Sequence, residues 1–210
     1  LILSSDDTIN LGTIAAPATL NIGWNQSTAD DGWGGNTTKA TGLLDTSTGT
    51  LTAQLATLNV GLTSGRGTAE GTFIMGSGTS ITTNIVNVGM GGTSEGGATG
   101  TFDYRGGTLT FTGTDTSLNF GSGSLHVADG KSLTLGATTN RLDALRIGYN
   151  ASWTDLADSS INLATDTLIA FLDNELSVGR VVSGSIYGKA DGSLILSSDD
   201  TINLGTIAAP

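Results

Sequence analysis

Short segments in which apolar and polar residues alternate recur along the chain, and a glycine follows each of them. The pattern is x-apolar-x-apolar-Gly, as in Thr19–Gly23 (TLNIG) and Thr57–Gly61 (TLNVG). Residues two apart point to the same face of a β-strand, so the pattern predicts short strands with one buried face. The glycine permits the positive φ angle of a tight turn after the strand. Further copies are Thr8–Gly12, Ile85–Gly89, Ser117–Gly121, Ser132–Gly136, Ala144–Gly148, Glu175–Gly179 and Thr201–Gly205.

A second motif, Gly-Thr/Ser-apolar, alternates with the first and begins at Gly49, Gly71, Gly100, Gly107, Gly123, Gly184 and Gly192. From Gly23 onward, successive glycines of the first motif are 38, 28, 32, 15, 12, 31 and 26 residues apart. A coil of two or three short strands takes roughly 20 to 35 residues, within the range of solenoid repeats. Several gaps therefore match one coil, and the short gaps match parts of a coil.

The fold class predicted from this repetition is all-β, a parallel β-solenoid. The motifs share one strand-then-glycine phase, which favours stacking of equivalent strands around a continuous core. An antiparallel sandwich of short strands is the alternative, because turn signals every 8 to 12 residues also fit it. The stretch Asp166–Leu176 has apolar residues at helical spacing and is either one helix or further strands, with strands favoured.

The segment Leu1–Pro17 recurs without change as Leu194–Pro210, 193 residues later. Two distant segments of one domain rarely stay identical while everything between them diverges. We therefore expect a longer protein in which residues 1–193 form one tandem unit and residues 194–210 begin the next. Two duplicated segments inside a single domain are the alternative.

Composition excludes several classes of protein. The 210 residues include 32 Gly, one His and no Cys, and only 13% are charged. The 8 Lys+Arg are scattered and outnumbered by 19 Asp+Glu, which argues against a nucleic-acid interface. Disulfides and a Cys-ligated zinc site are excluded, and no apolar run approaches the length of a membrane span. The net charge of -11 is expected to keep a long array of units soluble.

The stretches VNVG (Val86–Gly89) and GGATGTFDYRGGTLTFTG (Gly96–Gly113) resemble the Gly/Thr-rich β-strand repeats of large bacterial exoproteins, adhesins and autotransporter passenger segments. The likeness covers most of the chain but is compositional. It implies a right-handed parallel β-helix, secretion to the extracellular space or cell surface, and a structural or adhesive role.

Acidic residues gather at one candidate calcium site. Asp30, Asp31 and Asn36 lie in the sequence DDGWGGN, and oxygen-rich turns of this kind bind calcium. Calcium takes six to eight ligands, and the spacing of a known calcium loop is absent. Ordinary solvated turns are the alternative interpretation.

Exposed aromatic side chains are a candidate glycan-binding group. Trp24 and Tyr149 follow glycines in similar contexts, Ile-Gly-Trp-Asn and Ile-Gly-Tyr-Asn, and Trp33 and Trp153 lie close by in sequence. Aromatic rings stack on sugars, but they also cover the ends of small cores.

The sequence offers few candidate catalytic residues. Asp103, Tyr104 and Arg105 form one mixed triplet, in which Asp103 and Arg105 share a strand face if the stretch is extended. His126 alternates with Leu125 and Val127 and is expected to point outward. A polysaccharide-active β-helix enzyme needs clustered carboxylates with cations beside them, so we expect no enzyme.

We expect instead a structural repeat of a secreted fibre, sheath or adhesin stalk that acts by coil stacking and association with neighbouring copies of itself. A glycan-binding adhesin module is the main alternative. The residues expected to build the stack are Leu20, Ile22, Gly23, Leu58, Val60, Gly61, Val86, Val88, Gly89, Leu145, Ile147, Gly148, Leu176, Val178 and Gly179.

Overall fold

A computed structural model describes residues 1–27, 38–91, 97–150, 156–163, 165, 167–182 and 189–205. The described residues form β-strands, turns and loops, with no helix among them. The strands are β1 (Thr8–Leu11), β2 (Ala18–Asn25), β3 (Lys39–Asp45), β4 (Thr50–Thr63), β5 (Thr68–Met75), β6 (Thr79–Met90), β7 (Ala98–Tyr104), β8 (Thr108–Phe111), β9 (Ser117–Phe120), β10 (Gly123–Val127), β11 (Ser132–Leu135), β12 (Leu142–Asn150), β13 (Leu156–Asn162), β14 (Thr167–Val181), β15 (Lys189–Ile195) and β16 (Thr201–Leu204).

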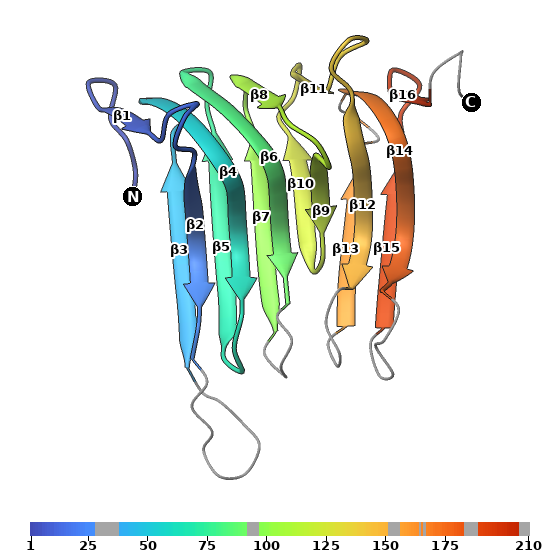
Figure 1. Ribbon diagram of the computed structural model, residues 1–210, viewed down its shortest axis with the longest axis horizontal. Coiled ribbons are helices and arrows are strands. Elements are labelled where there is room, and N and C mark those ends of the chain that lie inside the picture. Colours follow the sequence, from blue (N-terminus) through green and yellow to red (C-terminus); the bar gives the residue numbers. More distant parts are fainter. Residues whose placement is uncertain are drawn as a thin grey trace.

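The strands build a parallel β-solenoid of about five turns, with β1 and β16 at opposite ends of the stack (Figure 1). Equivalent strands of successive coils pair in parallel, as β4 does with β6 and β5 with β7. The fold class predicted from the repeated motifs is thus confirmed, and the antiparallel sandwich is wrong. The ambiguous stretch before Leu176 belongs to β14, so strand is confirmed over helix there.

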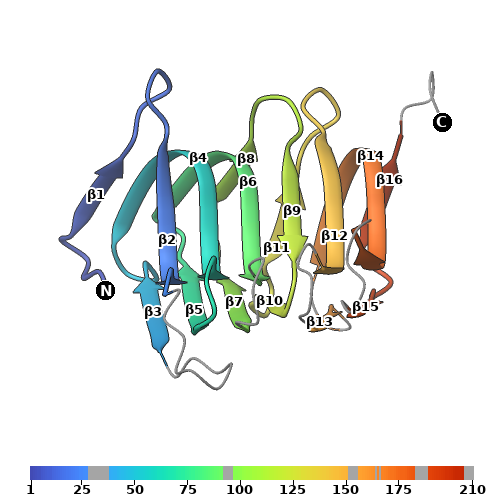
Figure 2. The ribbon, with the colours of Figure 1, turned by 60° about the horizontal axis from the view of Figure 1, so that its bottom comes forward.

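The long strands β4, β6 and β14 curve around the coil, and in the other coils two shorter strands take their place, as β8 and β9 do beside β6. A separate strand then returns on the other side of the core (Figure 2). Within the described residues, the first layer is a ten-stranded sheet in the order β1-β4-β6-β9-β12-β14-β11, with β2, β8 and β16 paired beside it. The return strands form a four-stranded sheet, β10-β7-β5-β3, and the pair β13-β15. The return layer is therefore interrupted between β10 and β13.

Apolar side chains at alternate positions fill the space between the layers. Leu58 and Val60 on β4 are 0% exposed, and so is Phe73 on β5. The Phe73 ring stacks on the Phe102 ring of the next coil, with centroids 5.5 Å apart. Of the residues expected to build the stack, Ile22, Leu58, Val60, Val86, Val88, Leu145 and Ile147 are buried, Leu20 and Leu176 are partly buried, and Val178 is exposed in the last coil.

Five of the nine motif glycines have the expected positive φ but lie within their strands, whereas Gly12, Gly136 and Gly205 have a positive φ directly after a strand end, and Gly121 follows β9 without one. Gly61 has a φ of 68° and lies inside β4, which continues to Thr63. Gly23, Gly89, Gly148 and Gly179 likewise lie within strands. The prediction of a tight turn at these positions is therefore wrong. At four of these five glycines, all except Gly179, a Cβ would lie within 2.3 Å of a backbone carbonyl oxygen at the return layer, where a side chain has no room.

Candidate functional site

The two ends of the described solenoid expose large apolar side chains. Among the described residues, every exposed large hydrophobic side chain lies in the first coil or the last. Those of the first coil are Leu1, Ile2, Ile14, Trp24 and Leu43, and those of the last are Val178, Val181, Ile195, Leu196 and Leu204. At the N-terminal end a shallow cavity of about 200 Å³ opens between β2 and β3, with Leu20, Ile22 and Leu44 in its lining. The ends thus expose the edge of the same core that the middle coils bury.

A ladder of asparagine side chains runs along the outer face of the long sheet. Asn59 Nδ2 donates to Asn21 Oδ1 at 2.7 Å, Asn87 Nδ2 to Asn59 Oδ1 at 2.8 Å, and Asn119 Nδ2 to Asn87 Oδ1 at 2.9 Å. These asparagines hold the same place in the pentamer, and the strand register aligns them. The sequence motif shows the repeated Asn, but only the register shows that each amide bonds to the next.

The ladder ends in a cluster of charged side chains near the C-terminal end. Arg146 donates from one guanidinium nitrogen to Asn119 Oδ1 at 3.0 Å and from Nε to Glu175 Oε2 at 2.8 Å. Arg180 also donates to Glu175, and the Tyr149 ring lies beneath both guanidinium groups. Burial raises the pKa of the Glu175 carboxyl, but the hydrogen bonds from Arg180 and Arg146 outweigh burial, and the net pKa lies below its usual value. Glu175 is therefore an anion at neutral pH that ties the last two coils together.

We expect replacement of a central ladder residue to destabilise the stack. Asn87→Ala leaves the Asn59 carbonyl and one Asn119 N–H without their partner, which costs about 1 to 3 kcal/mol of unfolding free energy. Asn10 supplies the control, because its exposed side chain on β1 makes no hydrogen bond to a described residue. Asn10→Ala should change stability by less than about 0.5 kcal/mol. Urea unfolding of the two variants measures both values, and equal losses would contradict a stabilising ladder.

A second ionic cluster lies on the return layer. Asp103 on β7 accepts hydrogen bonds from Arg105 at 2.7 Å and pairs with His126 on β10 at 2.9 Å. The parallel register places His126 opposite Asp103, a contact between residues 23 apart in the chain. Burial raises the pKa of Asp103, but Arg105 and His126 more than offset it, so this pKa is lowered. The outward His126 and the shared face of Asp103 and Arg105 agree with the sequence analysis. Sequence spacing alone did not show the Asp103–His126 pair.

Asp103 is the carboxylate in direct contact with Arg105 and His126. A second carboxylate, Asp45 on β3, acts on Asp103 and Arg105 through its charge. The described residues contain no group of three or more His, Cys, Asp or Glu side chains that could hold a metal ion. The calcium candidates Asp30, Asp31 and Asn36 lie outside the described residues.

The candidate aromatic residues do not form one platform in the described part of the chain. Trp24 on β2 is 42% exposed, and its Nε1 donates to Ser64 Oγ at 3.4 Å. Tyr149 lies on β12, and β4, β6 and β9 intervene between the two strands in the sheet. Trp33 and Trp153 lie outside the described residues. The two described rings therefore lie at separate levels of the stack.

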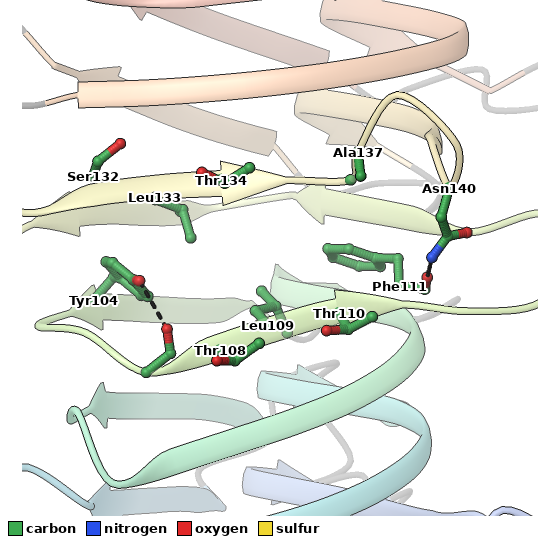
Figure 3. A pocket seen from close by; sticks show the side chains of 12 residues that line it. Tyr104, Thr108, Leu109, Thr110, Phe111, Ser132, Leu133, Thr134, Ala137 and Asn140 are labelled. Atoms are coloured by element: carbon green, nitrogen blue, oxygen red, sulfur yellow. Dashed lines mark hydrogen bonds between the residues drawn. The ribbon is translucent and has the colours of Figure 1, made fainter.

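A cleft of about 310 Å³ interrupts the long sheet between β8 and β11 (Figure 3). β8 pairs with β6 and β11 pairs with β14, so the two facing edges do not pair with each other. Tyr104 donates to the Gly107 carbonyl at 3.0 Å, and Asn140 Nδ2 donates to the Phe111 carbonyl at 2.6 Å. Leu109 and Leu133 are among its lining residues, and Tyr104, whose pKa is raised by burial, is the one titratable residue of the lining. The cleft is a break in strand pairing whose one titratable lining group, the Tyr104 hydroxyl, donates to a backbone carbonyl.

Comparison of the chain with protein-family models, with curated proteins and with solved structures finds no match. In the part of the chain that the structure describes, no helix is present that could span a bilayer.

Proposed function

We propose that the protein is a structural repeat unit of a secreted or cell-surface fibre, sheath or adhesin stalk, acting through coil stacking and association with copies of itself. The observation that carries this proposal is the confinement of exposed large apolar side chains to the two end coils of the described chain. Open ends of a parallel solenoid also present unpaired strand edges, which are templates for further strands. A neighbouring copy would cover both the apolar surface and the edges.

The lateral surface supports an extended array rather than a globular aggregate. The net charge of -11 makes side-by-side approach of units unfavourable at low salt. Burial of the apolar ends favours end-to-end approach instead. A catalytic role is not part of the proposal, and neither is binding of nucleic acid. A glycan-binding role would need the two described candidates, Trp24 and Tyr149, to act from separate levels of the stack, so we favour the structural role.

The proposal predicts that units align into rods. Negative-stain electron microscopy of the purified chain should show end-to-end filaments at high protein concentration. A chain of two units, residues 1–193 followed by residues 1–210, should appear as one straight rod of twice the length. Adding millimolar calcium tests Asp30, Asp31 and Asn36, because calcium-dependent filaments would make them the ligands to examine first.

Two variants locate the contact. Val178→Lys places a charge on the apolar C-terminal end, where Val178 is 45% exposed, and should shorten or abolish filaments of the single unit. Thr99→Lys adds the same charge at an exposed position on the side of the return layer and should leave filaments unchanged. Single units that stay apart at every concentration, together with two-unit chains that appear as two independently oriented particles, would overturn the structural role.

A further inference from the structure

Both copies of the duplicated segment, Leu1–Pro17 and Leu194–Pro210, make backbone hydrogen bonds to neighbouring strands. Counted from the first residue of the segment, the first copy uses odd-numbered positions for these bonds. Asp45 N donates to Leu1 O and Leu3 N donates to Asp45 O, each at 2.9 Å. Thr50 N donates to Asp7 O at 3.0 Å. The contacts at positions 1, 3 and 7 of the segment thus attach it to the end of β3 and the start of β4, the strands that follow it along the stack.

The second copy of the segment uses even-numbered positions. Leu163 N donates to Ile195 O at 2.9 Å, and Gly205 N donates to Leu172 O at 2.8 Å. Ile195 and Gly205 repeat Ile2 and Gly12, so they are positions 2 and 12 of the segment. These contacts attach it to the end of β13 and to β14, the strands that precede it along the stack.

The two sets of bonds are compatible with one strand in one place. Along an extended strand, the N–H and C=O groups of successive residues point to alternate sides, so odd and even positions bond to different neighbours. One copy of the segment can therefore bond to β13 and β14 of one unit and to β3 and β4 of another at the same time. Neither set of bonds has to break for the other to form.

The side-chain faces of the two copies also agree. Ile9 lies opposite Leu51 of β4, and its counterpart Ile202 lies opposite Ala170 of β14. Leu51 and Ala170 are both fully buried, so the same isoleucine faces the core at either end. A segment shared by two units would continue the core without a change of face.

Identical residues of the two copies differ in exposure. Leu3 is 2% exposed because the coil formed by β3 and β4 covers it, whereas its counterpart Leu196 is 43% exposed. At the same end, Ser177 Oγ is buried without a hydrogen-bond partner of normal geometry among the described residues, although it lies close enough to Glu175 to help lower the pKa of that carboxyl. Ser177 occupies the ladder position of the ELSVG pentamer, and Asn21, the first member of the ladder, makes no donation to a described residue.

We propose that the partner of each end is a second copy of this unit, joined through a single shared copy of the duplicated segment, with β13 and β14 of one unit on one edge and β3 and β4 of the next on the other. The inference rests on the structural function proposed above and names its interface. In the joined state, Leu196 is buried as Leu3 is, and Asn21 of the following unit donates to Ser177, which extends the amide ladder across the junction.

Hydrogen exchange measured by nuclear magnetic resonance tests the edge assignment directly. In the 210-residue chain the Leu3 amide should be protected and the Leu196 amide should exchange freely, although their surroundings in sequence are identical. In the two-unit chain, the Leu196 amide at the central junction should gain at least about 100-fold protection, as expected for an amide inside a cooperative sheet. Unchanged exchange at that position would overturn the shared junction.

A matched pair of proline variants supplies the second measurement. Leu3→Pro removes an N–H that bonds to Asp45 and should lower the melting temperature of the 210-residue chain by about 5 °C or more. Leu196→Pro removes the equivalent N–H from a free edge and should shift it by less than about 1 °C. Leu3→Ala, which keeps the N–H, separates the loss of the bond from the loss of the side chain.

The same Leu196→Pro change should become destabilising at the centre of the two-unit chain. If that chain is a straight rod in which Leu196→Pro stays neutral, the shared junction is wrong while the structural function stands. If the two units orient and unfold independently, both the shared junction and the proposed structural function are wrong. Equal effects of Leu3→Pro and Leu196→Pro in the single unit, after correction by Leu3→Ala, would refute the assignment of opposite edges.

Discussion

Gly61→Ala is expected to destabilise the protein by about 2 to 5 kcal/mol, or to prevent folding. A Cβ atom built on Gly61 would lie 1.9 Å from the Thr99 carbonyl oxygen of the return layer, far inside van der Waals contact. The residue also has a φ of 68°, which costs an L-amino acid about 1 to 2 kcal/mol. The steric clash with backbone adds about 1 to 3 kcal/mol to the loss of unfolding free energy, because the long sheet and the return layer would have to move apart.

Two other glycines separate the cost of the positive φ from the cost of the close contact with backbone. Gly130 has a φ of 69° with no atom within 4 Å of its Cβ position, so Gly130→Ala should cost only the backbone strain of about 1 kcal/mol. Gly97 has neither the positive φ nor a close neighbour, and Gly97→Ala should be neutral or slightly stabilising. Guanidinium unfolding of the three variants should give this order of stability. Similar losses for Gly61→Ala and Gly130→Ala would show that the close approach of the layers is not what requires glycine.

Phe102→Ala should have the other large effect, a loss of about 3 to 5 kcal/mol in unfolding free energy. The Phe102 side chain is 0% exposed and stacks on Phe73 of the preceding coil. The residues on either side are held by parallel strand pairing to β5 and β10, so the coil cannot collapse into the cavity left behind. The variant also removes an aromatic contact between coils, which adds about 0.5 to 1.5 kcal/mol to the loss of burial.

Phe171→Ala is the matched control. Phe171 on β14 is only partly buried, and its ring is covered by the Arg141 guanidinium rather than by core side chains. Its removal should cost about 1 kcal/mol. Thermal unfolding followed by circular dichroism compares the two, and a Phe171→Ala loss as large as that of Phe102→Ala would mean that the core is not the main source of stability.

Most of the fold could be predicted from the chain because it rests on local chemistry. Alternation in TLNVG determines which side chains of a strand share a face, and this holds in any sheet. Repetition of the pentamer with one phase favoured parallel stacking, since equivalent strands bury equivalent residues. The burial of Leu58 and Val60 and the positive φ of Gly61 follow from the motif.

Contacts between coils could not be predicted, because they depend on register and on variable spacing between motifs. Asp103 meets His126 only because β7 and β10 pair in one particular register. The cleft between β8 and β11 arises where successive glycines are 15 and 12 residues apart and the strands are short, and no pattern within either strand marks it.

The glycines show most clearly what the sequence determines and what only the tertiary structure decides. The sequence by itself determined that the pentamer ends in glycine and that its backbone can adopt a positive φ. Only the tertiary structure decided why: Gly61 and Gly71 face each other across the two layers, where a Cβ on Gly71 would lie 2.1 Å from the Gly61 backbone nitrogen. The duplicated segment is a second example. The sequence shows that its two copies are identical, but only the neighbouring coils of the folded chain show which edge of each copy is hydrogen-bonded. Local pattern specifies which face of a strand is apolar, and the distance between layers, which depends on every coil at once, specifies where no side chain fits.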